Sequence, residues 1–279
     1  MLIPLEDNFE DVLMKAAAGL GLGKSKLAEA AGLPVAEVTA LLRGRLKPEA
    51  LRKLALVLQL DGPALEALAR GESAPAPIQV AGLQQFNSAF PIPGYAAMTV
   101  NSYLVVCPHT AVAVAFDTGT KGEALVEYLQ EHGLDLRAIF LTHTHRDHVA
   151  AVPALRAAFP EANLHGPRRE PFAGACGVGE GDCFEYGSLK IEARLTSGHS
   201  KGGTSYLISG LTDPRAMVGD ALFAGSQGGV PEAQYAHALK INRAKLLSLV
   251  PVTILCPGHG PLTTVAHERR WNPFYAASG

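Results

Sequence analysis

The stretch that decides the fold is Leu141-Thr142-His143-Thr144-His145-Arg146-Asp147-His148, which places three imidazoles and one carboxylate within six residues. The apolar run 138–141 predicts a short buried strand, and the alanine-rich run 149–159 predicts a helix. The histidines therefore lie on a loop between a strand and a helix, where neighbouring side chains can converge.

The spacing of these side chains favours metal binding. His143 and His145 are two residues apart, so in an extended segment both imidazoles point to one side and can hold one divalent ion. Asp147 and His148 follow where the chain begins to turn, so they can serve a second ion nearby. Imidazole and carboxylate ligands suit zinc, iron or manganese, and the lack of cysteine here argues against a closed structural zinc site. The alternative is a polar loop whose histidines only cap the following helix, but so dense a set favours metal.

The pattern His-x-His-x-Asp-His resembles the metallo-β-lactamase superfamily of hydrolases, and four further motifs of that family occur in the expected order. Phe116-Asp117-Thr118-Gly119 is similar to the first motif, whose Asp orients the metal loop. The others are a loop histidine at His199, an aspartate at Asp220 and a last histidine at His259. The resemblance covers roughly residues 78 to 279 and implies an αββα sandwich, in which two sheets pack face to face between outer helices.

The resemblance also implies a role for each candidate residue. The first metal site would comprise His143, His145 and His199, and the second Asp147, His148 and His259. Asp220 would bridge the two divalent transition-metal ions, zinc by preference and iron or manganese otherwise. Two cations so close lower the pKa of a shared water, so that hydroxide is the nucleophile, and they polarise the substrate carbonyl. Asp147 and Asp220 are the expected catalytic carboxylates, and the other five histidines are expected in packing or at the surface.

The residues that follow the motifs indicate a substrate class. The segments 202–206, 220–226 and 268–274 look most like the bacterial glyoxalase II-like branch, which hydrolyses thioesters of small thiols such as hydroxyacylglutathione. Only 20 residues follow His259, however, so the C-terminal helical domain that holds glutathione in full-length glyoxalase II is expected to be absent. We therefore expect a small-molecule thioester or ester as substrate. Two alternatives are a mononuclear-iron persulfide dioxygenase and a metabolite-sensing, DNA-binding regulator.

Residues 1–70 differ in composition from the rest of the chain. Their Leu, Ala, Glu and Lys residues recur at helical spacing, which predicts an all-helical domain. The tight connection Ala31-Gly32-Leu33 predicts a helix-turn-helix, and the stretch 26–33 resembles the repressor-type, Cro-like family. Two prolines and small residues make 71–77 a linker, so the metal-hydrolase domain is expected to span 78–279. The helices are expected at 9–18, 25–31, 35–43, 48–59 and 63–70.

The case for DNA binding by this helical domain is weaker. Its expected recognition helix at 34–43 begins with apolar and acidic residues, where such helices usually carry polar side chains for base edges. Residues 1–73 contain nine basic and ten acidic side chains, a net charge of −1. A local basic set could still touch phosphates: Lys24, Lys26, Arg43, Arg45 and Lys47. We favour a role in subunit association, giving a homo-oligomer, or in covering the catalytic domain.

The remaining sequence features exclude several classes of protein. A chain of 279 residues with 48% hydrophobic and 18% charged residues is ordinary for a globular protein, and its net charge of −2 attracts neither nucleic acid nor anionic membrane. The first residues are acidic where a signal peptide needs lysines, and no stretch approaches the roughly 18 apolar residues of a membrane span. We therefore expect a cytoplasmic protein with no membrane partner and with its four cysteines reduced.

From residue 78 the pattern changes to mixed strands and helices. The strands are expected at 79–86, 100–106, 110–116, 138–141, 163–165, 182–186, 188–195, 204–209, 215–219 and 252–256. The second and third of these are expected to form a hairpin. The helices are expected at 121–132, 148–158 and 232–249.

Overall fold

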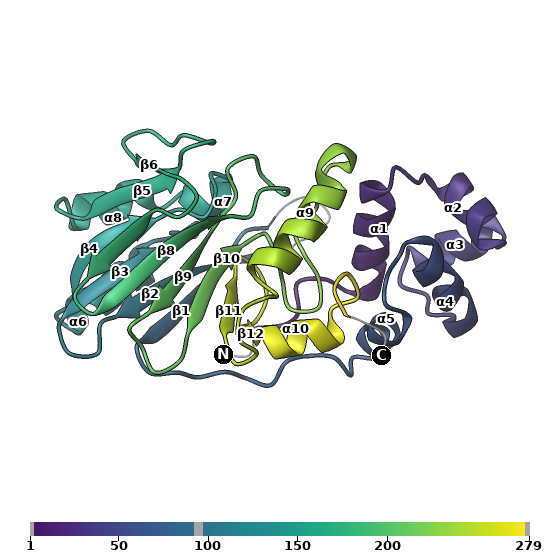
Figure 1. The fold of residues 1–279 in the computed structure, drawn as a ribbon, viewed down its shortest axis with the longest axis horizontal. Coiled ribbons are helices and arrows are strands. Elements are labelled where there is room, and N and C mark those ends of the chain that lie inside the picture. Colours follow the sequence, from purple (N-terminus) through teal and green to yellow (C-terminus); the bar gives the residue numbers. More distant parts are fainter. Residues whose placement is uncertain (1–2, 92–96, 277–279) are drawn as a thin grey trace.

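Two six-stranded β-sheets form the body of the computed structural model, which describes residues 3–91 and 97–276 (Figure 1). The first sheet has the order β1 (Leu83–Ala89), β2 (Thr99–Val106), β3 (Val112–Phe116), β4 (Asp135–Phe140), β5 (Asn163–Pro167) and β6 (Cys176–Val178). The second has the order β12 (Thr263–Thr264), β11 (Ile254–Pro257), β10 (Arg215–Gly219), β9 (Thr204–Ser209), β8 (Leu189–Leu195) and β7 (Cys183–Tyr186).

Successive side chains along each strand point to opposite faces of the sheet, so each sheet contributes to two hydrophobic cores. On β3, Val114 and Phe116 face the core between the two sheets, whereas Ala113 and Ala115 face the core beneath the outer helices. These helices are α6 (Glu123–Glu131), which buries Leu125, and α8 (Val152–Ala158). The first sheet is therefore covered by helices on one side and by the second sheet on the other.

The second sheet is built in the same way. Met217 of β10 faces the core between the sheets, while Ala216 and Val218 face the outer side. There they pack with α9 (Glu232–Lys245) and α10 (Val265–Trp271). Helices thus lie on both outer faces, and the predicted αββα sandwich is confirmed.

Some elements depart from the sequence-based expectation. The helix expected at 148–158 is split into α7 (Arg146–Val149) and α8, whose first turn contains Pro153. Proline has no N–H to donate to the preceding turn, so a continuous helix is disfavoured there. The last predicted helix ends at Lys245 rather than 249, because the chain turns to bury Leu246 and Leu247. Strands β6 and β12 and helix α10 were not predicted from the sequence.

Five helices precede the sheets, at the positions that the helical spacing predicts. They are α1 (Phe9–Gly19), α2 (Lys24–Ala31), α3 (Val35–Leu41), α4 (Pro48–Val57) and α5 (Gly62–Ala69). Leu13 of α1 lies in the same hydrophobic core as Ala238 of α9, and α5 lies beside α10. Gly19 permits a close approach, because a Cβ there would come within 2.2 Å of the Tyr235 ring. The helical segment therefore adds to the outer layer of the second sheet.

The turn between α2 and α3 has a left-handed residue, Gly32, with φ of 60°. The five basic residues of the predicted phosphate-contacting set are exposed, and Lys47 makes an ion pair of 3.1 Å with Glu37. DNA binding stays a prediction. Within the described part of the chain, no helix combines the length and apolarity needed to cross a bilayer.

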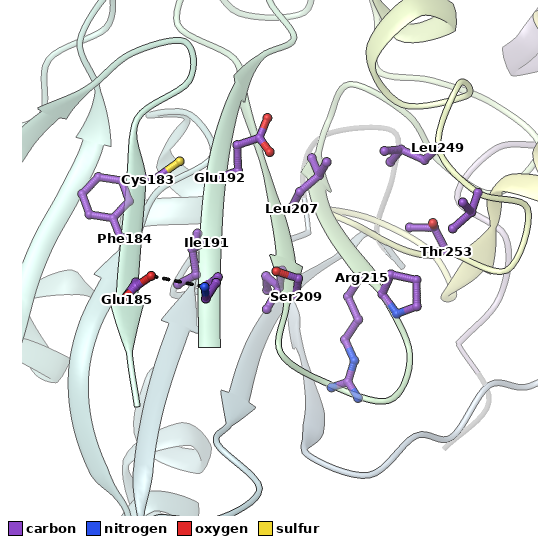
Figure 2. Close-up of a pocket in the computed structure, with 14 residues that line it drawn as sticks. Cys183, Phe184, Glu185, Ile191, Glu192, Leu207, Ser209, Arg215, Leu249 and Thr253 are labelled. Carbon is purple, nitrogen blue, oxygen red and sulfur yellow. Dashed lines mark ion pairs between the residues drawn. The ribbon is translucent and has the colours of Figure 1, made fainter. Parts of the chain in front are cut away.

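A pocket of about 440 Å³ follows strands β7, β8 and β9 (Figure 2). Its lining includes Leu207 and Leu249, and the ion pair between Lys190 and Glu185 spans 3.6 Å at its edge. None of the seven predicted metal ligands lines this pocket. The predicted metal site therefore lies outside this pocket.

Candidate metal centre

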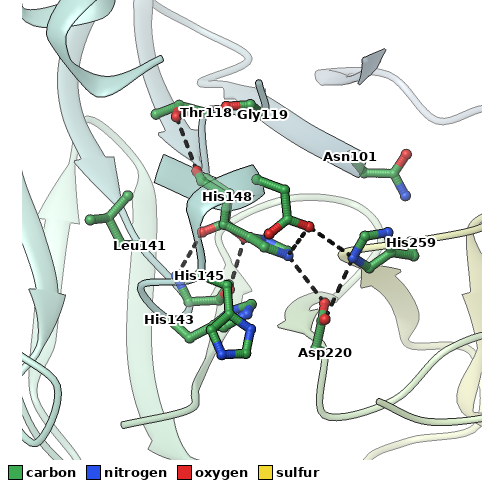
Figure 3. Close-up of polar contacts among 12 residues, drawn as sticks. Asn101, Thr118, Gly119, Leu141, His143, His145, His148, Asp220 and His259 are labelled. Carbon is green, nitrogen blue, oxygen red and sulfur yellow. Dashed lines mark hydrogen bonds and ion pairs between the residues drawn. The ribbon is translucent and has the colours of Figure 1, made fainter. Parts of the chain in front are cut away.

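All seven predicted ligands meet where strands of both sheets end. Figure 3 labels His143, His145, His148, Asp220 and His259 among them. His143 and His145 lie on the loop after β4, and Asp147 and His148 lie on the short helix α7. The other three follow strands of the second sheet, and they are His199 after β8, Asp220 after β10 and His259 after β11. The first sheet thus supplies four residues and the second sheet three.

Six of these residues lie in the two groups expected from the sequence, and His143, His148 and Asp220 form a third, overlapping group. The ligand atoms of His143, His145 and His199 lie within 4.8 Å of one another, and so do those of Asp147, His148 and His259. Asp220 lies between the groups. Its carboxylate oxygens are 3.3 Å from His199 Nε2, 3.3 Å from His148 Nε2 and 3.5 Å from His259 Nε2. Asp220 thus faces imidazoles of both groups, and its role as a bridge stays a prediction.

Two glycines allow the loops to approach this closely. A Cβ on Gly219, whose φ is +49°, would lie 2.4 Å from Thr142 Oγ1 in the metal loop. A Cβ on Gly258 would lie 2.2 Å from Asp220 Oδ1. Any larger residue at either position would push a ligand-bearing loop away from the centre.

The nitrogen of each buried imidazole that faces away from the centre has a hydrogen-bond partner. His148 Nδ1 donates to Asp117 Oδ2 (2.8 Å) and His259 Nδ1 donates to Thr99 O (2.6 Å). His143 Nδ1 is 3.0 Å from Thr142 Oγ1, whose own proton goes to Asp117 Oδ2. Such bonds fix the ring orientation and point Nε2 toward the centre, where a metal ion would take the place of a proton.

Three polar atoms at the centre are buried and have no hydrogen-bond partner. They are His143 Nε2, His148 Nε2 and Asp220 Oδ1, the last two of which lie 3.3 Å apart without forming an aligned hydrogen bond. Burying a polar atom without a partner costs on the order of 1–3 kcal/mol, so such atoms need an explanation. Cations bound between the two groups would satisfy all three, and the residues present therefore fit a divalent-metal site.

The electrostatics of the centre agree with this fit. Burial and the neighbouring imidazole of His148 lower the pKa of His143 well below its usual range, which keeps its Nε2 lone pair free. Burial opposes the charged form of His148, but the carboxylates of Asp220 and Asp117 raise its pKa to about 10. Asp220 has a strongly lowered pKa despite its burial, because His259 and His148 surround it. The buried carboxylates thus create a field that attracts positive charge.

The types of ligand residue in this centre, and their order along the chain, are also found in a known protein family. The family-level description of the metallo-beta-lactamase superfamily matches residues 96–259, more than half of the 279 residues. The chain belongs to the metallo-beta-lactamase superfamily. The matched region ends at the last of the seven candidate ligands, and the helices α1 to α5 lie before it.

Curated members of the superfamily are similar at modest identity. A probable metallo-hydrolase of Streptococcus pyogenes serotype M6 is 27% identical over 201 residues, which cover 63% of this chain and 85% of that protein. A hydroxyacylglutathione hydrolase of Enterobacter sp. is 35% identical over 145 residues, or 50% of this chain. The match spans only 54% of the Enterobacter protein. These similarities support a metallo-hydrolase type of enzyme.

Solved structures of the superfamily share the sandwich. ETHE1 from Myxococcus xanthus superposes with a TM-score of 0.56 at 27% identity, covering 67% of this chain and 83% of that one. TTHA1623, solved in a di-iron-bound form, gives a TM-score of 0.51 at 29% identity, covering 66% of this chain and 99% of that one. Neither of these similarities extends over the whole of this superfamily member.

Three residues near the centre were not predicted from the sequence. Glu170 accepts from Thr144 N (2.9 Å) and Gly202 N (3.0 Å), so it joins the metal loop to the His199 loop. Asn101 Nδ2 donates to Pro257 O (3.0 Å) and Gly260 O (2.8 Å), which holds the His259 loop. Glu6 Oε2 lies 3.9 Å from His259 Nδ1. These single residues carry no motif, so only the folded structure reveals them.

The five histidines outside the superfamily motifs are absent from the centre. They are His109, His132, His165, His237 and His267, and none belongs to a group of possible metal ligands among the described residues. His165 stacks on Phe140 with 4.6 Å between ring centres, and its Nε2 is 3.1 Å from the Tyr186 hydroxyl. The packing role expected for these residues holds for His165.

Proposed function

We propose that the chain is a dinuclear metal-dependent hydrolase that acts on a thioester or small ester, with a reaction like that of hydroxyacylglutathione hydrolase. One observation carries the proposal. Both groups of ligand atoms have three members each, and the Asp220 carboxylate lies within about 3.5 Å of imidazole nitrogens from both. A single ion would leave one of the two groups without a function.

The residues of the centre have separate tasks in this reaction. Two divalent ions held here would lower the pKa of a water and polarise the substrate carbonyl. Asp220 supplies negative charge between the groups, and Asp147 supplies it beside His259, whose Nε2 is 3.3 Å from Asp147 Oδ2. The hydrogen bond from His148 to Asp117 fixes the buried side of the centre. His145 and His199 lie at the solvent side, where a substrate can enter.

We propose zinc as the native metal, with iron or manganese as alternatives. Five imidazoles and two carboxylates suit all three, since none of the ligands is a thiolate. The di-iron form of TTHA1623 supports iron as a genuine competitor at this fold. The proposed partners are a small thioester or ester substrate and further copies of the chain, with DNA a less favoured partner of α1 to α5.

The first experiment is metal analysis of protein purified without chelator, combined with a panel of thioesters, esters and lactones. We expect close to two transition-metal ions per chain and hydrolysis of at least one thioester. One ion in a fully loaded sample, together with oxygen consumption on glutathione persulfide, would replace the hydrolase with a mononuclear-iron dioxygenase. A retarded band with DNA upstream of its own gene, without hydrolysis, would favour the regulator.

A further inference from the structure

The segment before and within α1 passes beside the metal centre. Glu6 Oε2 lies 3.9 Å from His259 Nδ1, and its side chain is 13% exposed. A Cβ on Gly260 would lie 3.2 Å from the backbone nitrogen of Glu6. The N-terminal segment is therefore in direct contact with the loop that carries the last ligand.

The same segment is tied to the loop that follows Asp220. Asp7 accepts from Ser226 Oγ (2.5 Å) and makes an ion pair with Lys15. Lys15 Nζ donates to Gln227 O (2.8 Å). The ammonium also lies 4.9 Å from the ring centre of Phe223. These contacts fix α1 against the loop that follows Asp220.

A pocket of about 380 Å³ lies between these two contacts. It is lined by Glu6, Asp7, Asp11, Met14, Lys15, Ala18, Met98, Gly229 and Val230. Two lining residues touch candidate ligands, because Gly229 O accepts from His199 Nδ1 (2.8 Å) and Glu6 faces His259. The pocket therefore adjoins the metal centre, and α1 forms one of its walls.

The charge of this wall is unbalanced. Lys15 is neutralised by its ion pair with Asp7, and Glu6 lies 3.9 Å from His259 Nδ1, so Asp11 is the lining carboxyl group outside the ion pairs of the described residues. Met14, Met98 and Val230 give the remainder of the wall an apolar character. A tail with its own carboxylates would meet repulsion here, whereas an apolar tail with an ammonium group would be attracted.

Building on the proposed hydrolase, we propose that this pocket binds the part of the substrate that does not react, and that α1 selects it by charge. The preferred substrates are thioesters or esters with a neutral or cationic, largely apolar leaving group. Glutathione thioesters are disfavoured, because their leaving group, glutathione, carries two carboxylates. The helical segment thus determines specificity without touching the reacting carbonyl.

The test compares three thioesters on the metal-loaded full-length protein: acetylthiocholine, which is cationic, ethyl thioacetate, which is neutral, and S-acetyl-3-mercaptopropionate, which is anionic. We expect kcat/KM to fall in that order. Asp11→Asn should lower the cationic-to-anionic ratio about threefold to tenfold through KM, the size of a partly exposed charge contact. Asn can still accept the bond from Asn8 N (3.0 Å) that caps α1, so the helix should persist.

One control and one further test variant separate selectivity from folding. Glu29→Gln removes an exposed carboxylate on α2 and should leave the ratio unchanged. Glu6→Gln should also lower the ratio, with metal content measured in parallel because Glu6 touches His259. An unchanged ratio in Asp11→Asn and Glu6→Gln, with full metal content, overturns the assignment of the pocket.

Binding without turnover distinguishes this idea from the hydrolase itself. Calorimetric titration with two non-hydrolysable thioethers, 2-(ethylthio)ethyl-trimethylammonium and 3-(ethylthio)propionate, should show tighter binding of the cation. If the cation binds more tightly but no thioester is cleaved, the hydrolase is wrong and the charge-selective pocket stands. If thioesters are cleaved but both thioethers bind equally, the pocket is wrong and the hydrolase stands.

Discussion

The two halves of the metal centre differ in burial and in charge. His143, His145 and His199 form a group with no charge of its own, and only His143 of the three is fully buried. Asp147, His148 and His259 are all buried and include a carboxylate. The second half is therefore built like a protein core with its own counter-charge, whereas the first half opens to solvent. This difference predicts a tightly held ion in the second half and a more exchangeable ion in the first.

The scaffolds of the two halves explain the difference. His148 bonds to Asp117, which follows β3, and His259 bonds to the backbone of Thr99 at the start of β2. Strands of the first sheet therefore orient the second half directly. His199, in contrast, is held by the backbone of Gly229 on a loop.

The largest effect is expected from Asp220→Ala, which removes the charge between the halves. Turnover of the best thioester should fall at least about 10²-fold, the size seen when one electrostatic transition-state contact is lost. Metal analysis should show reduced occupancy of the second site. His267→Ala should keep both near wild type, because the His267 imidazole lies 2.9 Å from Ser73 O and belongs to no group of possible metal ligands among the described residues. Undiminished turnover in Asp220→Ala would contradict the bridging assignment.

Asp117→Asn should weaken the second half more than the first, because Asp117 bonds His148 directly but reaches His143 only through Thr142. The carboxylate accepts from Thr142 N (2.7 Å), from Thr142 Oγ1 (2.8 Å) and from His148 Nδ1 (2.8 Å), and an amide cannot accept all three. Loss of such an orienting partner typically lowers metal affinity about 10- to 100-fold. Competition with a chromophoric chelator measures this change, with the surface variant Asp135→Asn as control. Equal weakening of both ions would show that the halves are not independent.

Chelation should remove the two ions at different rates. The half with His145 and His199 is accessible to a chelator, so its ion should leave first and the buried ion later. Stopped-flow mixing with dipicolinate, followed by metal analysis of the protein at each stage, resolves the two steps. Release of both ions in one phase would remove the proposed difference between the halves.

An effect on stability rather than on catalysis is expected from a buried carboxyl group outside the centre. Burial raises the pKa of Glu268 from its ordinary 4.5 to about 7, whereas equally buried Asp220 has a lowered pKa because imidazoles face it. Between pH 4.5 and about 7, Glu268 of the unfolded chain releases its proton, whereas Glu268 of the folded chain retains it. Stability should therefore fall by about 3 kcal/mol as pH rises from 4.5 to 7.

Glu268→Gln should remove that loss, because an amide does not titrate. Urea unfolding at pH 5 and at pH 7.5 measures it, with Glu29→Gln as the control and both proteins in the same metal state. A pH dependence identical to that of the wild type would show that Glu268 ionises normally in the folded protein.

The sequence predicts the parts of this molecule that are locally concentrated. His143, His145, Asp147 and His148 lie in one motif, so the clustering of these side chains and, through resemblance, the sandwich could be predicted. Glu170, Asn101 and Glu6 could not, because each acts through contacts with segments far away in the chain. The break between α7 and α8 was missed because the apolar spacing of 148–158 continues across Pro153.

The packing of α1 against α9 also has a consequence for synthesis of the chain. Lys15 finds its partner in Gln227, 212 positions later, and Leu13 shares its core with residues that follow Asp220. While the sheets are being synthesised, the apolar face of α1 that later packs on α9 therefore has no partner from α9. Contacts between such distant segments form slowly, and exposed apolar surface invites aggregation in the meantime. Helix α1 can therefore reach its final place only after the segments that contain Gln227 and α9 have been synthesised.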